Sequence, residues 1–195
     1  LNLCIPCNAT VGIIGKSGVG KTTFIDLLLG IISPNKGSIN VDGKNINDNL
    51  NSWKSIIGYV PQNVFLMDDT IKANIAFGVN NADIDLDRIK SAIQSSELTD
   101  FVSELQLGIE TNIGENGVKL SGGQKQRIGI ARALYNNPEF IIFDESTSSL
   151  DEKTEKSIIK TISLIKGKKT LIIISHKETV VSICDKIYQL EKGNF

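Results

Sequence analysis

Eight residues near the start of the chain restrict its possible folds and its chemistry more than any other stretch. They read Gly15-Lys16-Ser17-Gly18-Val19-Gly20-Lys21-Thr22 and lie between two apolar runs, residues 9–14 and residues 23–29. The first run predicts a buried strand and the second a helix, which is the context that a phosphate-binding loop, or P-loop, requires. Glycines let the backbone turn its N–H groups toward anionic oxygens, and the helix dipole adds to the attraction. The weaker alternative is a glycine-rich turn that merely joins a strand to a helix.

Single side chains of the P-loop have predicted roles at the phosphates. Lys21 is expected to reach the β- and γ-phosphates of a nucleoside triphosphate. The hydroxyl group of Thr22 is expected to bind Mg²⁺, a hard cation that prefers oxygen ligands. The predicted nucleotide-binding set in this part of the chain consists of Gly15, Lys16, Ser17, Gly18, Val19, Gly20, Lys21, Thr22 and Thr23.

A second helix start that could bind an anion lies at residues 120–127, which read Leu-Ser-Gly-Gly-Gln-Lys-Gln-Arg. Ser121 can cap a helix, and the two glycines after it let backbone N–H groups approach an anion closely; a plain serine-capped helix is the alternative. The stretch resembles, without a substitution, the signature of the ATP-binding cassette (ABC) family. The resemblance implies that the nucleotide is ATP and that two cassettes dimerise head to tail. The residues that would then contact the γ-phosphate held by the partner cassette are Ser121, Gly122, Gly123 and Gln124.

Two carboxylates end the apolar run Phe140-Ile141-Ile142-Phe143-Asp144-Glu145. The run predicts a strand buried on both faces of a parallel sheet, and ligands of such sheets bind beyond the carboxyl ends of the strands. Asp144 is expected to hold Mg²⁺ in the way of the Walker B aspartate of P-loop enzymes. Glu145 is expected to polarise the attacking water, because hydrolysis needs a positioned proton acceptor.

Three shorter motifs complete the resemblance. Tyr59-Val60-Pro61-Gln62 is similar to the Q-loop, in which Gln62 would contact Mg²⁺ and the water. Residues 149–151, Ser-Leu-Asp, are similar to the D-loop that crosses the dimer interface, although they also fit a capped helix start. The apolar run 171–174 predicts a strand, and the only histidine of the chain, His176, follows it. A lone histidine is more often structural, but its match to the switch histidine of the family assigns it to the γ-phosphate.

Together these motifs predict the catalytic and metal-binding residues. The catalytic residues are predicted to be Glu145, His176 and Gln62, and the Mg²⁺ ligands Thr22, Gln62 and Asp144.

Alternation of apolar runs and helical periodicity predicts an α/β fold with an inserted helical subdomain. The resemblance to the ABC family implies that its core is a P-loop NTPase (RecA-like) core with a mainly parallel sheet. The whole chain, residues 1–195, is expected to form one cassette domain. Its core would comprise residues 1–64 and 138–195, and the helical subdomain residues 65–137. Asp42-Gly43 predicts a tight turn after a short strand, and residues 53–60 are apolar enough to return to the core.

Charge, apolar runs and cysteine spacing weigh against nucleic-acid binding, a membrane span and a zinc or redox site. The formal net charge of −1 gives no general reason to bind nucleic acid or an anionic membrane. We see neither an apolar run long enough to span a bilayer nor a signal peptide, so we expect this chain to be soluble as it stands. Cys4 and Cys7 have C-x-x-C spacing, but the second half of a zinc site is missing, and we expect no metal or redox role for the pair.

The branch of the family is indicated by two loops. Residues 64–75 resemble the segment that follows the Q-loop in exporters, and residues 111–117 resemble the x-loop before their signature, although a plain surface loop would also fit the latter. Within exporters, Asp68-Asp69 and the run from Ser175 are similar to lipid-linked saccharide flippases. The resemblance implies a transmembrane domain as partner, in the same longer polypeptide, and a place on the cytoplasmic side of the cell membrane.

Both ends of the chain suggest a part of a longer protein. Family members begin with an antiparallel strand pair that carries an aromatic residue against adenine, and residues 1–14 contain no Phe, Tyr or Trp. Other functions remain open at this point: a non-transport ABC ATPase that acts on DNA or on the ribosome, and a catalytically inactive regulatory cassette. The span between Gln62 and Leu120 holds neither a long coiled coil nor a second cassette, Glu145 and His176 are present, and no guanine-binding Asn-Lys-x-Asp motif occurs. These observations favour an ATP-hydrolysing exporter or flippase cassette.

Overall fold

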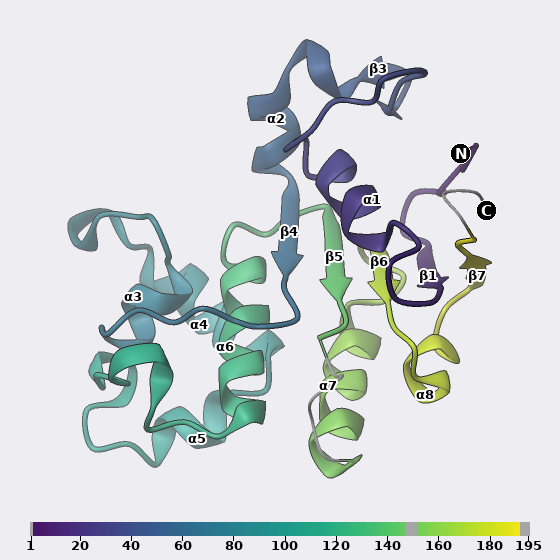
Figure 1. The fold of residues 1–195 in the computed structure, drawn as a ribbon. Coiled ribbons are helices and arrows are strands. Elements are labelled where there is room, and N and C mark those ends of the chain that lie inside the picture. Colours follow the sequence, from purple (N-terminus) through teal and green to yellow (C-terminus); the bar gives the residue numbers. More distant parts are fainter. Residues whose placement is uncertain (1, 147–151, 192–195) are drawn as a thin grey trace.

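The computed structural model describes residues 2–146 and 152–191, and every structural statement below refers to these residues. Their main sheet has five strands in the order β4-β5-β6-β1-β7, and all neighbouring strands are parallel (Figure 1). The strands are β1 (Thr10–Ile14), β4 (Ile57–Val60), β5 (Phe140–Asp144), β6 (Thr170–Ile174) and β7 (Lys186–Gln189). This arrangement confirms the predicted α/β class with a mainly parallel sheet. It also brings the carboxyl ends of all five strands to one edge.

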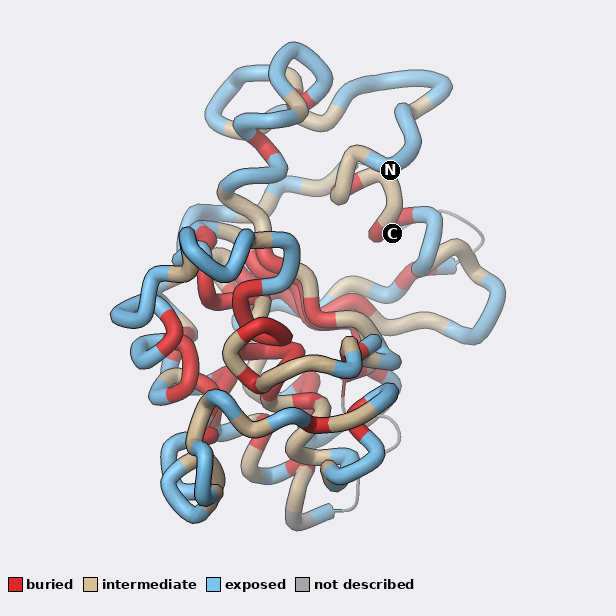
Figure 2. The backbone as a smooth tube through the Cα atoms, turned by 90° about the vertical axis from the view of Figure 1, so that its left-hand side faces the viewer, coloured by how far each residue is buried: buried red, intermediate tan, exposed pale blue. Residues whose placement is uncertain are grey.

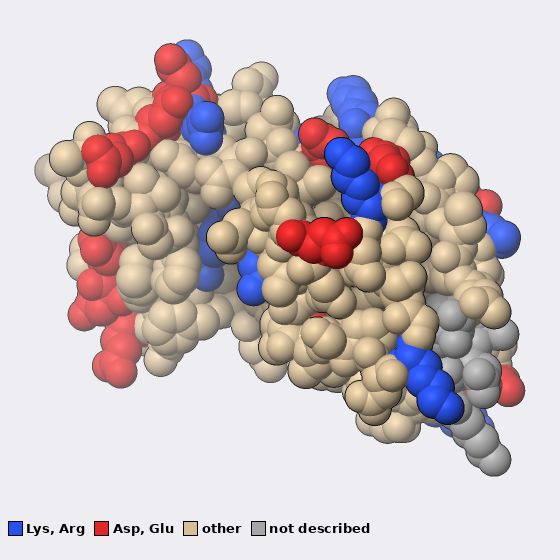
Figure 3. Space-filling view, turned by 90° about the horizontal axis from the view of Figure 1, so that it is seen from above, with Lys and Arg blue, Asp and Glu red and all other residues tan. Residues whose placement is uncertain are grey.

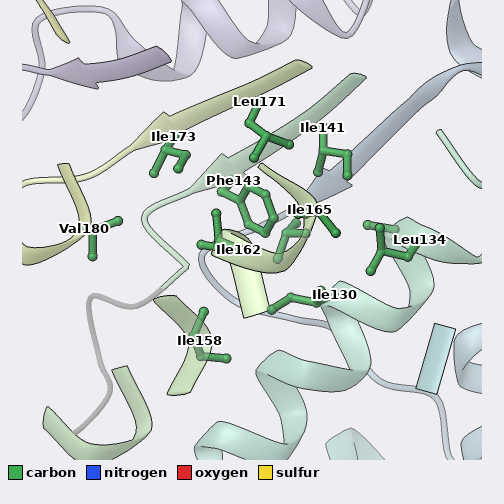
Figure 4. Close-up of a cluster of buried hydrophobic side chains, with 12 residues drawn as sticks. Ile130, Leu134, Ile141, Phe143, Ile158, Ile162, Ile165, Leu171, Ile173 and Val180 are labelled. Atoms are coloured by element: carbon green, nitrogen blue, oxygen red, sulfur yellow. The ribbon is translucent and has the colours of Figure 1, made fainter. Parts of the chain in front are cut away.

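Helices cover both faces of this sheet. Successive side chains of a strand point to opposite sides, and because β5 and β6 carry apolar side chains on both sides, both faces must be buried. On one face, Phe143 of β5 packs with Ile158 and Ile162 of α7 (Glu152–Ile165) and with Ile130 of α6 (Gly122–Tyr135) (Figure 4). On the other face, the neighbouring Ile142 packs with side chains of α1 (Lys21–Leu28), among them Phe24, Ile25 and Leu28. A short helix, α8 (Glu178–Val181), joins β6 to β7.

Residues 65–137 contain helices and no strand of the main sheet. The helices are α3 (Ile71–Ile75), α4 (Leu86–Ser95), α5 (Thr99–Ser103) and α6, with 3₁₀ turns at Asn81–Asp83, Gly108–Glu110 and Glu115–Gly117. They enclose a second buried cluster, which includes Ile71, Ile89 and Leu98 (Figure 2). Helix α6 belongs to both clusters, since Ile130 and Leu134 face the sheet while Ile128 and Tyr135 face the other helices. The division into a core and a helical subdomain stays a prediction, and α6 is the element that the two parts share.

A small hairpin, β2 (Asn40–Val41) and β3 (Lys44–Asn45), projects from the sheet. Its turn residues Asp42 and Gly43 have φ angles of 49° and 79°, the left-handed pair that a two-residue hairpin of this kind requires. A 3₁₀ turn (Ile46–Asp48) and α2 (Leu50–Ser55) follow. The apolar stretch 53–60 is therefore split: Trp53 lies in α2 and donates from its indole Nε1 to the carbonyl of Leu28, 2.6 Å away, and only residues 57–60 form strand.

Candidate nucleotide-binding site

Four adjacent strands deliver the predicted site residues to one edge of the sheet. Gly15 follows β1, Gln62 lies two residues after β4, Asp144 ends β5, and His176 lies two residues after β6. Because the strands are parallel and adjacent, segments that are far apart in the sequence meet at their carboxyl ends (Figure 1). The fold therefore places the catalytic candidates beside the P-loop.

The P-loop turns sharply from β1 into α1. Gly18 and Gly20 have φ angles of 80° and 108°, which favour glycine, and Gly20 is the N-cap residue of α1. No side chain caps this helix, and its first turn contains no acidic residue. The N–H groups of the first turn are thus not occupied by a capping side chain, as an anion site at a helix start requires. Gly15 is required for a different reason, since a Cβ there would lie 2.7 Å from the carbonyl oxygen of Leu190.

Lys21, Glu145 and His176 form one cluster of polar contacts. The Nζ atom of Lys21 lies 3.4 Å from Glu145 Oε1 and 2.8 Å from His176 Nε2. His176 Nε2 lies 2.9 Å from the same carboxylate oxygen. Lys21 also donates to the P-loop carbonyls of Gly15 and Lys16, at 2.8 and 3.2 Å. The three side chains predicted to surround the γ-phosphate thus lie within hydrogen-bonding or ion-pair distance of one another.

Glu145 is held from several directions. Gln62 donates from Nε2 to its other carboxylate oxygen at 3.3 Å, and the backbone N–H of Glu145 donates to the carbonyl of Ile174 at 2.8 Å. Its φ angle of 44° lies in the left-handed region that side chains other than glycine seldom adopt. Such strained conformations cost about 1–3 kcal/mol and cluster at functional sites. The backbone bends at the point where the carboxylate must leave the strand for the site.

Asp144 has a partner that the sequence analysis did not assign. Tyr59 of β4 donates its phenol O–H to Asp144 Oδ2 at 3.1 Å. Burial raises the pKa of Asp144, with the Glu145 charge acting in the same direction, and outweighs the opposing hydrogen bond from Tyr59. Burial and the charge of Asp144 also raise the pKa of Tyr59, so that the phenol remains a donor. The hydrogen bond engages one oxygen of the Asp144 carboxylate, Oδ2.

The donor set fits a hard cation. Thr22 lies exposed in the first turn of α1, and Asp144 and Gln62 enter the same edge of the sheet from β5 and from the segment after β4. Hydroxyl, carboxylate and amide oxygens are the ligands that Mg²⁺ takes in proteins, usually together with water and substrate phosphates.

A metal site made by protein side chains alone is a separate question. In the described part of the chain, no group of three His, Cys, Asp or Glu side chains could hold a metal ion. Cys4 and Cys7 are both exposed free thiols.

The signature segment begins α6 with a reciprocal cap. Ser121 Oγ accepts from the N–H of Gln124 at 3.2 Å, and the N–H of Ser121 donates to Gln124 Oε1 at 2.8 Å. Helix α6 packs against β4, α3 and α4, whereas the P-loop follows β1, three strands further along the sheet (Figure 1). With a strand spacing of about 4.8 Å, that separation is about 14 Å. The structure does not bring the signature to the P-loop of its own chain.

Several contacts around the site were not predicted. Tyr59 stood in the Q-loop motif without a role, because only the register of β4 beside β5 brings it to Asp144. Residues 111–113, predicted as part of an x-loop, pair with the segment after the Q-loop: Ile71 donates to the carbonyl of Thr111 at 3.0 Å, and Ile113 to that of Asp69 at 3.1 Å. The predicted D-loop, residues 149–151, lies outside the described residues.

The face of the molecule in Figure 3 carries charged side chains in small scattered groups, some of which combine both signs, on a mostly uncharged surface. A broad basic surface, the electrostatic requirement of nucleic-acid binding, is not seen on this face. Among the residues that the structure describes, no helix has the length and apolar character needed to cross a membrane.

Comparison with known proteins shows the family of the chain. The model of the ABC transporter family matches residues 1–148. The chain therefore belongs to the ABC transporter family, and it is an ATPase domain of that class.

Individual relatives place it more closely. An ATP-dependent lipid A-core flippase of Ralstonia nicotianae is 39% identical over 195 residues, which are 99% of this chain and 33% of the relative. The ABC transporter ATM1 of Toxoplasma gondii is 38% identical over 194 residues, 99% of this chain and 17% of that protein. A solved bacterial Atm1-family ABC exporter with ATP bound superposes with a TM-score of 0.86 at 37% identity, covering 97% of this chain and 33% of the exporter chain. The chain spans a third or less of the length of these relatives.

Proposed function

We propose that this chain binds MgATP between two copies of the cassette and hydrolyses it to drive export or flipping of a substrate across a membrane. The observation that carries the proposal is the cluster of Lys21, Glu145 and His176 beside an uncapped helix start. Relatives that are named as flippases and exporters support the transport role. The alternative of a non-transport ATPase acting on DNA or on the ribosome finds no support among these relatives.

Each residue of the cluster has a role that its position supports. Lys21 would exchange its contacts with Glu145 and the P-loop carbonyls for the β- and γ-phosphates of ATP. Glu145, freed from Lys21 but still near Gln62 and His176, would orient the attacking water and accept its proton. His176 would donate to the γ-phosphate. Thr22, Gln62 and Asp144 would hold Mg²⁺, which neutralises charge on the phosphates when it is bound.

The separation of the two anion-binding helix starts supports a dimer. Ser121, Gly122, Gly123 and Gln124 begin α6 beside β4, while the P-loop lies across the sheet at β1. A head-to-tail pair would let each signature complete the nucleotide site of the partner. Most of the association free energy would then come from the shared ATP.

An exposed aromatic patch, Phe65 and Phe77, supports a membrane-domain partner, and the flippase and exporter relatives support the further proposal that the cassette lies on the cytoplasmic side of the membrane. The two side chains are 60% and 48% exposed. Arg132 of α6 lies between them: it donates from Nη1 to the carbonyl of Phe65 at 2.8 Å, and its guanidinium carbon lies 4.7 Å from the ring centre of Phe77. Aromatic residues, phenylalanine among them, are enriched in protein–protein interfaces. Phe65 follows closely after Gln62 in the sequence and would connect a docked transmembrane domain to the nucleotide site.

Replacing Glu145 with Gln tests the catalytic assignment. The amide keeps the size of the side chain but cannot accept the proton of water, so we expect steady-state phosphate release to fall by about 10²–10⁴-fold while MgATP binding is retained. Glu152→Gln, on the exposed side of α7, serves as the matched control and should leave both unchanged. Phosphate release near the wild-type rate in Glu145→Gln would remove Glu145 from the catalytic role.

A further inference from the structure

A buried carboxylate outside the nucleotide cluster has two partners on one short segment. Glu155 of α7 is only 6% exposed. It accepts a hydrogen bond from the ammonium of Lys177 and another from the hydroxyl of Thr179. Both partners lie within three residues of His176. Burying a carboxylate is costly unless it is paired, so this triad fixes the relative position of α7 and the segment after β6.

The side chain of His176 is not itself fixed by packing. It is 47% exposed, whereas the preceding Ser175 is 4% exposed and its N–H donates to the carbonyl of Ile13 at 3.3 Å. Ser175 Oγ then accepts from the N–H of Lys177 at 3.0 Å, which makes a tight turn around His176. Besides its contacts with Lys21 and Glu145, the imidazole is placed by its backbone. That backbone is anchored on one side by the end of β6 and on the other by the contacts of Lys177 and Thr179 with Glu155.

We propose that Glu155 is a positioning residue for His176: it holds Lys177 and Thr179 so that the imidazole stays beside Lys21 and Glu145. The catalytic relevance of this arrangement rests on the proposed function, whereas the positioning itself does not. The alternative is that Glu155 only fastens α7 to the core, with no effect on the imidazole. The two interpretations differ in what happens at His176 when the carboxylate is replaced and the chain stays folded.

The test uses the fact that His176 is the only histidine among the 195 residues. Its ring Cε1–H and Cδ2–H proton signals are therefore unique in a spectrum of this chain purified without a histidine tag. In Glu155→Gln both signals should shift toward those of a free imidazole, because the turn is released from α7. The matched control Glu152→Gln, in the same helix and paired with Lys156 at the surface, should leave them in place.

A second variant covers the possibility that Glu155→Gln does not fold. Thr179→Val keeps the shape of the side chain and removes one of the two donors to Glu155, so it should move the same signals in the same direction by a smaller amount. Unchanged histidine signals in a folded Glu155→Gln or Thr179→Val variant would overturn the proposal. Since these spectra need no nucleotide, their result is independent of whether the chain hydrolyses ATP.

A double-mutant cycle connects the position of His176 to turnover. Glu155→Gln should lower kcat by about ten- to hundredfold through misplacement of the imidazole, with little change in MgATP affinity. In a His176→Ala background the same substitution should cause no further loss. An additional loss of equal size in that background would mean that Glu155 acts elsewhere and would overturn the positioning role. Shifted histidine signals in Glu155→Gln, together with a wild-type chain that does not hydrolyse ATP, would support the positioning and reject the proposed function.

Discussion

The ammonium of Lys21 lies 3.4 Å from the carboxylate of Glu145, and both side chains are largely shielded from water, at 11% and 18% exposure. A cation that we propose to bind phosphate and an anion that we propose to orient water thus form an ion pair in this structure. An incoming triphosphate would compete with Glu145 for Lys21, and its binding would release the carboxylate. In the proposed function, nucleotide binding therefore exchanges one anion beside Lys21 for another.

Replacing Lys21 with Ala is expected to weaken MgATP binding by about 10–100-fold, because it removes hydrogen bonds from a charged donor worth about 1.5–3 kcal/mol. Equilibrium titration with a fluorescent ATP analogue measures the dissociation constant. Lys90→Ala, an exposed change in α4, is the control. A dissociation constant equal to that of the wild type would show that Lys21 does not contact the phosphates.

ATP-dependent dimerisation should be seen in the Glu145→Gln chain, in which turnover is blocked. We expect a monomer without nucleotide and a weak dimer with MgATP, since the shared ligand supplies much of the association free energy and no membrane domain tethers the two copies. Sedimentation velocity measures the shift. Adding Ser121→Arg should abolish it, because a long cationic side chain would replace the small cap residue at the interface. A tight dimer without ATP would contradict this assembly.

Glu155 should also give the stability of the chain a defined dependence on pH. Burial raises its pKa, but the hydrogen bonds from Lys177 and Thr179 outweigh burial and hold the pKa below the ordinary value of 4.5. The charged form therefore stabilises the fold above pH 4.5, and this contribution is lost as the pH falls through the lowered pKa. We expect Glu155→Gln to lower the free energy of unfolding by about 1–3 kcal/mol at pH 7.

Thermal unfolding of the wild-type chain and of Glu155→Gln, from neutral pH down through the pKa of Glu155, measures this difference in stability. The gap in melting temperature between wild type and Glu155→Gln should be several degrees at neutral pH and should close on acidification. Glu152→Gln should leave the melting temperature unchanged at every pH, because its ion pair with Lys156 is exposed. A gap that widens as the pH falls would reverse the assigned sign.

Gly123 of the signature is confined by α7. A Cβ at this position would lie 2.4 Å from Cγ2 of Thr154, so Gly123→Ala should destabilise the fold by about 1–3 kcal/mol through overpacking. Adding Thr154→Ser to Gly123→Ala removes the methyl group that causes the clash, and it should recover most of the melting temperature lost in the single variant. If the glycine is also needed for backbone contact with ATP in the partner, the double variant should remain defective in ATP-dependent dimerisation. Failure of Thr154→Ser to restore stability would show that the clash is not the cause.

Much of the fold follows from local sequence patterns. The apolar runs at residues 9–14, 140–143 and 171–174 predict buried strands, and the structure confirms them as β1, β5 and β6. The helix after the P-loop and the Asp42-Gly43 turn were also predicted, because cap and turn chemistry is local. The sequence analysis did not divide the stretch 53–60 into a helix and a strand, because an apolar residue such as Trp53 fits a buried position in either element.

The identities of the site residues were determined by the sequence itself, because glycine spacing and chemically distinct side chains carry that information without a fold. Only the tertiary structure decided which of them meet. The order β4-β5-β6-β1 brings Gln62, Glu145, His176 and Lys21 to one edge, and the same order separates Ser121 from the P-loop of its own chain. The contacts of Tyr59 with Asp144 and of Glu155 with Lys177 likewise depend on strand register and helix placement. Such long-range pairings follow from the packing of the whole sheet, and no local pattern encodes them.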